Sequence, residues 1–295
     1  MQKILIVGSG DVARRILLQL AGHYRVFALL RKAEKQKDWR LAGAIPVLAD
    51  LDQRSSLDRL SGLADIVLHL APPPAQGTRD TRTRHMLAAL GKGKSLPRRL
   101  IYVSTTGVYG DCGGAQIDET RCVQAESPRA GRRVDAERVL RAWGQQTGVA
   151  VSILRAPGIY AADRLPLERL EKALPMLVAE DDVYTNHIHA EDLAAACIAA
   201  MRHGQANRTY NVVDDSALKM SDYFIQVADA FGLPHPPQVT RAQAASLLSP
   251  MQLSFMRESR RIGNRRIKNE LKLRLAFPTI ADGIADALKG KAACS

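Results

Sequence analysis

The sequence predicts an α/β fold in which a doubly wound parallel sheet carries a smaller, mostly helical C-terminal region. Two observations predict it. Short apolar runs alternate with amphipathic stretches through the first half of the chain, and a glycine turn follows the first apolar run. Such alternation indicates a parallel sheet with helices on both faces, because parallel strands need crossover connections. In folds of this class, ligands bind at the carboxyl ends of the strands.

Six apolar runs are expected to form strands, at residues 3–7, 24–30, 45–48, 66–70, 100–104 and 149–154. Helices are expected at 11–22 and near 132–146, because apolar residues recur there at helical spacing. The apolar face of the first helix consists of Val12, Ile16, Leu17 and Leu20, and that of the second of Ala136, Val139, Leu140 and Trp143.

The chain is expected to fold as two intimately joined units. The sheet domain would comprise residues 1–156 and 187–215, with a return to the sheet near 192–200 and 209–213. The smaller region would comprise 157–186 and 216–295. Since no long Gly/Ser linker separates these segments, we expect the smaller region to pack against the sheet domain as discontinuous pieces.

The composition sets limits on partners and location. The net charge is +12, from 42 basic and 30 acidic residues, but the basic residues are spread widely and aromatic residues make up only 5%. Binding to nucleic acid is therefore not expected, and solvated arginine-rich surfaces or an anionic small molecule account better for the charge. The four cysteines form no Cys-x-x-Cys pair, so no metal site is expected. No apolar run approaches the ~20 residues that span a bilayer, and we expect a cytoplasmic protein.

The turn at residues 8–13 has the spacing Gly-x-Gly-x-x-Ala between the first strand and the first helix. This context predicts a dinucleotide site, because the helix N-terminus offers free N–H groups to a pyrophosphate that the glycines allow to approach. A purely structural glycine turn is the alternative. The residues assigned to the pyrophosphate are Gly8, Ser9, Gly10, Asp11 and Val12.

The end of the second strand indicates the cofactor. Leu30 is followed by Arg31 and Lys32, where NAD-binding chains carry an acidic residue for the ribose hydroxyl. A guanidinium can bind a 2′-phosphate, so we expect NADP, with NAD as the second choice. An exposed basic turn without a cofactor role is the alternative. Further cofactor residues assigned at strand ends are Asp50, Leu51 and Ala71, although Asp50 could equally cap the segment that begins at Leu51.

Four segments carry a family resemblance. Residues 103–110 read VSTTGVYG, 154–160 LRAPGIY, 188–193 IHAEDL and 210–212 YNV. In this order and spacing they resemble the extended short-chain dehydrogenase/reductase family, which includes sugar-nucleotide epimerases and dehydratases. The resemblance implies that Pro157 lies on the nicotinamide side. The family's usual Gly-x-x-Gly-x-x-Gly turn has Val7 and Ala13 at its outer positions here, as in atypical members of the family.

The resemblance also defines the expected chemistry. Active members carry a Tyr-x-x-x-Lys pair on the helix after the fifth strand, and a Ser or Thr at the end of that strand, which Thr105 matches. Arg129 and Arg133 occupy the Tyr and Lys positions. Arginine cannot serve as a general base, although Arg133 can still bind ribose or phosphate. We therefore expect an atypical active site in which Thr105 acts together with Tyr109.

Two hypotheses follow for the function. The first is an NAD(P)-dependent oxidoreductase or epimerase/dehydratase-like enzyme acting on a polar substrate, with phosphorylated and nucleotide-linked compounds among the candidates. The second is a non-catalytic NADP(H)-binding regulator or sensor of the same fold. For the first hypothesis, Tyr160 is an alternative source of a phenol, and the basic run at 257–268 could place Arg260, Arg261 or Arg265 against an anionic substrate. The family resemblance also makes a homodimer the expected assembly.

Overall fold

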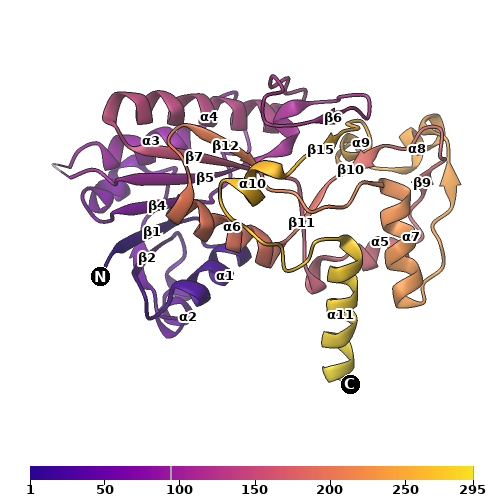
Figure 1. Ribbon diagram of the computed structural model, residues 1–295, viewed down its shortest axis with the longest axis horizontal. Helices are drawn as coiled ribbons and strands as arrows, with labels where there is room; N and C mark the ends of the chain where they lie inside the picture. Colours follow the sequence, from indigo (N-terminus) through magenta and orange to yellow (C-terminus); the bar gives the residue numbers. More distant parts are fainter. Residues whose placement is uncertain (94, 295) are drawn as a thin grey trace.

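A seven-stranded, fully parallel sheet forms the centre of the N-terminal half of the computed structural model, which describes residues 1–93 and 95–294 (Figure 1). The strands lie in the order β12-β7-β5-β4-β1-β2-β3. Their bounds are β1 (Lys3–Val7), β2 (Arg25–Leu30), β3 (Ile45–Leu48), β4 (Ile66–His69), β5 (Arg99–Thr105), β7 (Ala150–Ala156) and β12 (Arg208–Asn211). The direction of winding reverses between β1 and β4, which creates the crevice in which ligands of such sheets bind.

The predicted fold class is confirmed, and the six predicted strands are all present within one or two residues of their expected ends. One expectation was wrong. Residues 192–200 do not return to the sheet but lie within helix α6 (Ala190–His203), and only β12 adds a strand. The reason is the alanine-rich composition of this segment, which favours a helix over a β-strand.

Helices cover both faces of the sheet, as the alternation predicted. Helix α1 (Asp11–Leu20) packs against α6 on one face, where Trp39 of α2 (Gln36–Leu41) joins the same core. On the other face, α3 (Thr81–Leu90), α4 (Pro128–Thr147) and the 3-10 segment η2 (Arg54–Leu60) share a second core with the sheet. Figure 1 shows α3 and α4 above the sheet, with α1 and α2 below it.

Helix α4 begins four residues earlier than predicted. The Ser127 side chain accepts a hydrogen bond from the backbone N–H of Ala130, and Pro128 occupies the first helical position, where its missing N–H costs nothing. Gly148 ends the helix in a left-handed conformation. The early start matters for function, because it places Arg129 in the first turn of α4.

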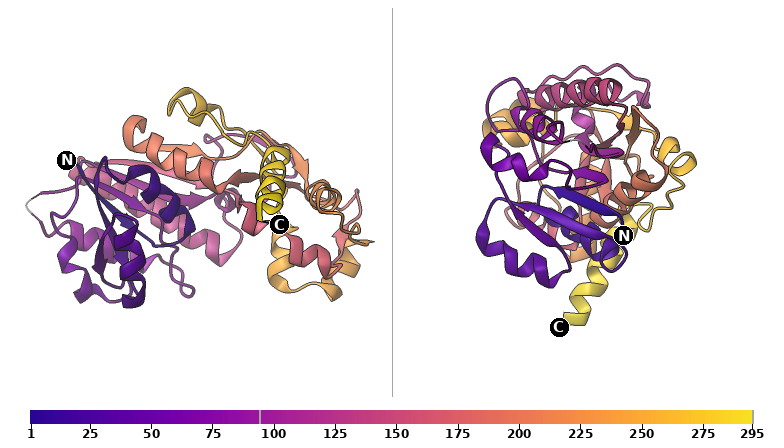
Figure 2. Two further views of the ribbon diagram at one scale, coloured as in Figure 1. Left: turned by 90° about the horizontal axis from the view of Figure 1, so that it is seen from below. Right: turned by 90° about the vertical axis from the view of Figure 1, so that its left-hand side faces the viewer.

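The smaller region consists of short elements around a separate apolar core. Tyr160, Leu170, Phe224, Val227 and Ile284 are buried together there. Its helices are α5 (Leu167–Glu171), α7 (Met220–Phe231), α8 (Arg241–Leu247), α9 (Pro250–Phe255) and α11 (Ile280–Cys294). Figure 2 shows this region beside the sheet domain, with α11 near the boundary between them.

Two pairs of short strands connect the smaller region to the sheet domain: β6 (Gln116–Ile117) with β15 (Arg261–Ile262), and β8 (Gly158–Tyr160) with β11 (His187–His189). Two further pairs lie within the smaller region itself: β10 (Tyr184–Thr185) with β13 (Leu218–Lys219), and β9 (Met176–Leu177) with β14 (Gln238–Val239). The β6–β15 pair brings the basic run near residue 260 back to the end of β5. Helix α10 (Arg265–Asn269) follows it and contacts β12.

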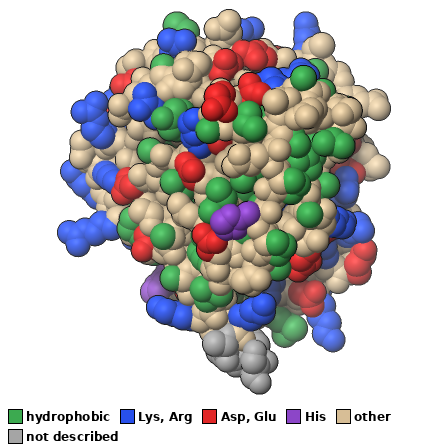
Figure 3. Space-filling model, turned by 90° about the vertical axis from the view of Figure 1, so that its right-hand side faces the viewer, with side chains coloured by type: hydrophobic (Ala, Val, Ile, Leu, Met, Phe, Trp, Pro, Cys, Tyr) green, Lys and Arg blue, Asp and Glu red, His purple; other side chains and the backbone are tan. Residues whose placement is uncertain are grey.

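The surface carries mixed charge. On the face in Figure 3, basic and acidic side chains are interspersed and do not gather into one continuous basic area. None of the helices in the described part of the chain has the length and apolar character needed to cross a membrane.

Candidate functional site

A cavity of about 410 Å³ lies at the carboxyl ends of the central strands, over the N-terminus of α1. The structure brings together there most of the cofactor residues predicted near the nicotinamide and the pyrophosphate, and Thr105 with them. These lining residues are Gly8, Ser9, Gly10, Asp11, Val12, Thr105, Arg133 and Pro157. The sequence placed them on four different segments, and the parallel sheet assembles them.

The glycine turn has the geometry of a phosphate cradle. Gly8 has a φ of +106°, and a Cβ at this position would lie 2.5 Å from the backbone nitrogen of Ala71. The backbones of Gly8 and Ala71 are therefore in close contact, and Ala71 packs behind the turn. A Cβ on Gly10, in contrast, would meet no described atom within 4 Å. This open space over the helix N-terminus fits a dinucleotide pyrophosphate. A side chain at position 10 would occupy the space, so the site needs a glycine there.

Asp11 would oppose a phosphate if its charge were uncompensated. Its carboxylate pairs with Arg15 one helical turn later at 2.8 Å and with Arg164 at 3.1 Å. Arg164 belongs to η4 (Ala162–Arg164) of the smaller region and lines the same cavity. No pattern in the sequence predicted a role for Arg164. Its position lets a cation from the smaller region reach the mouth of the phosphate cradle.

The residues predicted for the adenosine end do not line this cavity. Arg31 and Lys32 are exposed just beyond β2, and Lys32 lies 3.9 Å from Glu34. Asp50 accepts a hydrogen bond from the N–H of Asp52, and Leu51 is buried. The hydrogen bond from Arg82 is the main cause that lowers the pKa of Asp52, and the positive charge of Arg31 lowers it further. Arg31 therefore lies near Asp52.

Arg133, which the family resemblance puts at the position of the lysine, also lines the cavity. Its guanidinium donates to the Tyr102 hydroxyl and to the Val103 carbonyl, both at 2.9 Å, and lies 5.5 Å from the centre of the Tyr102 ring. These bonds fix a cation beside the end of β5. This is where the lysine of active family members would bind the nicotinamide ribose.

A buried ion pair supports the floor of the cavity. Glu137 of α4 receives two hydrogen bonds from Arg155 of β7, at 2.7 and 3.1 Å, and one from the hydroxyl of Ser104 at 2.6 Å. Both charged side chains are about 95% buried. Ser104 lines the cavity directly before Thr105, so this pair fixes the end of β5 to α4 and β7.

A second pocket of about 220 Å³ opens beside the first and shares Thr105 and Pro157 with it. Arg129, which the family resemblance puts at the position of the tyrosine, lines this pocket. The smaller region contributes Tyr184, Met220 and the pair of Glu258 and Arg260, which lie 2.6 Å apart. The pocket therefore carries two arginines and one carboxylate. Because Thr105 lines both pockets, ligands bound in the two pockets could both contact it.

The two phenols considered from the sequence do not reach either pocket. Tyr109 is buried beneath the guanidinium of Arg155, and its hydroxyl donates to Asn211 at 2.7 Å. Tyr160 is buried in the core of the smaller region and donates to the Thr279 carbonyl. Burial raises the pKa of both phenols. We therefore do not retain Tyr109 as a catalytic candidate, whereas the position of Thr105 keeps it as one.

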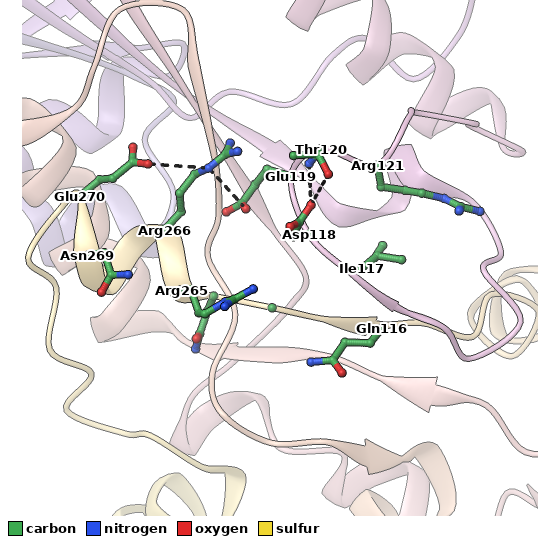
Figure 4. Close-up of a pocket in the computed structure, with 12 residues that line it drawn as sticks. Gln116, Ile117, Asp118, Glu119, Thr120, Arg121, Arg265, Arg266, Asn269 and Glu270 are labelled. Carbon is green, nitrogen blue, oxygen red and sulfur yellow. Dashed lines mark hydrogen bonds and ion pairs between the residues drawn. The ribbon is translucent and has the colours of Figure 1, made fainter.

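The three arginines considered in the basic run have different surroundings. Arg260 lines the 220 Å³ pocket, and Arg261 lies over the Tyr184 ring at 5.0 Å. Arg265 lies elsewhere, in a polar cavity of about 870 Å³ between residues 116–121 and α10. Figure 4 shows its side chain directed into that cavity, opposite Asp118 and Gln116.

This larger cavity shares no lining residue with the other two pockets. Its charged walls largely neutralise one another. Arg266 lies between Glu119 at 3.7 Å and Glu270 at 3.8 Å, as the dashed lines in Figure 4 show. Glu119 also accepts the backbone N–H of Asn211, the residue that holds Tyr109. We interpret the charged residues of this larger cavity as stabilising the edge of the sheet. Within the described residues, no group of three or more potential metal ligands lies together.

Comparison with known proteins agrees with this geometry. Residues 4–213 match the model of the NAD dependent epimerase/dehydratase family. The chain belongs to this family. The matched span contains the glycine turn and, apart from Lys3, the whole parallel sheet, as well as Arg129 and Arg133.

Individual relatives differ in activity. The chain is 25% identical to GDP-6-deoxy-D-mannose reductase of Pseudomonas aeruginosa over 255 residues, which cover 77% of this chain and 80% of that protein. A structure of a functionally unknown conserved protein from Silicibacter pomeroyi has 30% identity and a TM-score of 0.81, with 99% of each chain covered. The dTDP-glucose 4,6-dehydratase of Bacillus anthracis, solved in complex with NAD, has 16% identity and a TM-score of 0.78, with 98% of this chain and 96% of that chain covered. At that identity, the likeness shows the fold alone.

Proposed function

We propose that this family member is an NADP-dependent reductase or epimerase-like enzyme that acts on a small polar substrate with an anionic group. The observation that carries the proposal is the junction of the two pockets at Thr105. A nicotinamide in the first pocket and a carbonyl in the second would meet there. When bound, the reduced nicotinamide supplies hydride to that carbonyl. Thr105 would orient the carbonyl oxygen by donating a hydrogen bond.

The charge of the second pocket supports an anionic substrate. Arg129 and Arg260 contribute two positive charges to its lining, against one negative charge from Glu258. Guanidinium groups bind carboxylates and phosphates through paired hydrogen bonds, which matches this lining. A volume of about 220 Å³ holds the reacting part of a substrate, so a nucleotide attached to it would extend beyond the pocket.

Replacing Thr105 by alanine tests the proposed junction. We expect Thr105→Ala to lower kcat/KM by roughly 10- to 100-fold, because the substrate oxygen loses a hydrogen bond made at the reacting centre. The affinity for NADPH should remain within about twofold. The measurement is NADPH oxidation with a panel of 2-oxo carboxylates, phosphorylated ketoses and nucleotide-linked keto sugars. Thr185→Ala, which removes another hydroxyl from the same pocket, is the matched control. An equal loss in both variants would contradict a special role for Thr105.

The preference for NADP rests on Arg31. This side chain is exposed directly after β2, at the position where NAD-binding chains carry an acidic residue. We expect Arg31→Ala to weaken NADPH binding by roughly 10- to 100-fold, the value of a charge-assisted hydrogen bond, and to leave NADH binding nearly unchanged. Calorimetric titration with both cofactors measures this difference. Arg59→Ala, at an exposed arginine of η2, should change neither affinity. Equal losses for NADPH and NADH would reject the 2′-phosphate contact.

A dinucleotide-binding sensor without turnover is the second candidate. It is favoured by Arg129, which lines the pocket where active family members place their phenol and cannot give up its proton near neutral pH. Saturable NADPH binding without oxidation across the whole panel would support the sensor and overturn the enzyme.

A further inference from the structure

We infer that Tyr184 supplies the proton that the missing phenol of α4 would have supplied. This inference rests on the proposed reduction of a carbonyl. The phenol would come from β10 of the smaller region, whereas Arg129, which lines the same pocket, belongs to α4. It would thus be a catalytic residue that enters the site from a different element than in the family's usual arrangement.

Tyr184 differs from the other tyrosines in its surroundings. All seven tyrosines lie in the described part of the chain, and Tyr184 is the one among them that lines the pocket containing Thr105. Tyr24 lies at the opposite, amino end of the sheet, beside Arg98 and Arg99. The remaining five are at least 93% buried: Tyr102, Tyr109, Tyr160, Tyr210 and Tyr223. Burial raises the pKa of each of these five phenols, which opposes proton loss.

Backbone hydrogen bonds and a close ring contact position Tyr184. Its strand β10 pairs with β13, where Tyr184 lies opposite Lys219, and its backbone N–H donates to the hydroxyl of Ser259 at 3.0 Å. Gly114 packs against the ring so closely that a Cβ there would lie 3.2 Å from a ring carbon. A phenol held in this way reaches a ligand with little loss of conformational freedom.

Positively charged side chains lie around the ring. The guanidinium of Arg261 lies 5.0 Å from the ring centre, and Arg129 and Arg260 line the same pocket. These cations would hold an anionic substrate beside the phenol. As the substrate carbonyl is reduced to an alcohol, the Tyr184 O–H bond breaks and the proton passes to the substrate oxygen. Water entering the pocket then returns a proton to the phenolate.

The first test asks whether the hydroxyl is accessible, without using activity. The protein is treated with N-acetylimidazole, which acetylates accessible phenols, and the modified tyrosines are mapped by peptide mass spectrometry. We expect acetylation of Tyr184 and of Tyr24, the positive control that is half-buried and far from the site. We expect none at Tyr109 or Tyr160. Modification of Tyr24 without Tyr184 would overturn the inference.

The second test uses Tyr184→Phe with the carbonyl probe of the panel that the wild type reduces fastest. Loss of a general acid typically costs about 10²- to 10⁴-fold, so kcat should fall at least about 100-fold while the Kd for NADPH stays within about twofold. The matched variant is Tyr109→Phe, which removes a buried phenol from Asn211 and should leave kcat within about threefold. Acetylation of the wild type should abolish turnover, and hydroxylamine, which removes the acetyl group, should restore it. This second route does not depend on the folding of the variant.

The outcomes separate the two claims. If the wild type reduces a probe and Tyr184→Phe keeps its kcat within about threefold, the proton donor is wrong and the proposed reductase stands. If the wild type binds NADPH and reduces no probe, the proposed reductase fails, and the proton-donor role fails with it.

Discussion

Replacing Gly10 by valine is expected to abolish detectable NADPH binding while the protein remains folded. A Cβ at this position meets no described atom within 4 Å, and the φ of −90° and ψ of −170° suit any residue. The added side chain would fill the space over the N-terminus of α1 that the pyrophosphate needs. We expect the Kd for NADPH to rise at least about 100-fold, which corresponds to about 2.7 kcal/mol.

The control for this experiment is Gly290→Val in α11, where a Cβ also meets no described atom within 4 Å. It should leave the affinity for NADPH unchanged. Binding is measured by calorimetry, and the melting temperature of each variant shows that it is folded. A Gly10→Val protein that binds NADPH as tightly as the wild type would place the cofactor somewhere other than the glycine turn.

The second large effect is expected at the buried pair of Glu137 and Arg155. Removal of one partner from a buried ion pair leaves an uncompensated charge, at a cost of about 3–5 kcal/mol. We therefore expect Glu137→Ala to lower the free energy of unfolding by this amount in urea titrations. Ser104 would lose its acceptor in the same variant, so the end of β5 should loosen and the affinity for NADPH should fall as well.

Two further variants show whether the charge is responsible. Asp58→Asn removes an exposed partner of Lys92, where solvent screens the pair, and its stability should stay close to that of the wild type. The double variant Glu137→Leu with Arg155→Met removes both buried charges and should be more stable than Glu137→Ala. A double variant less stable than the single one would show that packing and the Ser104 hydrogen bond matter more than the unpaired charge.

The sheet domain was predictable because its signals are local. Each central strand is an apolar run of four to seven residues, and the glycine turn follows β1 directly. Gly10 was assigned from the strand–turn–helix context, whereas Thr105 and Pro157 were assigned from the family resemblance; the parallel sheet brings all three to one cavity because the carboxyl ends of β1, β5 and β7 lie at the same edge. The expectation for residues 192–200 was wrong because an apolar, alanine-rich segment has no alternation that distinguishes a strand of the sheet from a helix that covers it.

The substrate side was not predictable in the same way. Thr105 and Tyr184 are far apart in sequence. Tyr184 lies on β10, which pairs with β13, and each of these strands has only two residues, too few to produce a periodic pattern. Tyr109 follows Thr105 by four residues and so was expected beside it. The 3-10 segment η3 (Thr106–Tyr109) instead turns its ring toward Asn211, a contact across 102 positions that the local sequence does not encode.

A crystal structure of the protein grown with saturating NADPH tests the central claim most directly. The account predicts the pyrophosphate over Gly10 at the start of α1, the 2′-phosphate within reach of Arg31, and the nicotinamide beside Thr105 and Arg133. A cofactor bound outside this cavity, or an empty cavity in crystals of protein that binds NADPH in solution, would contradict it.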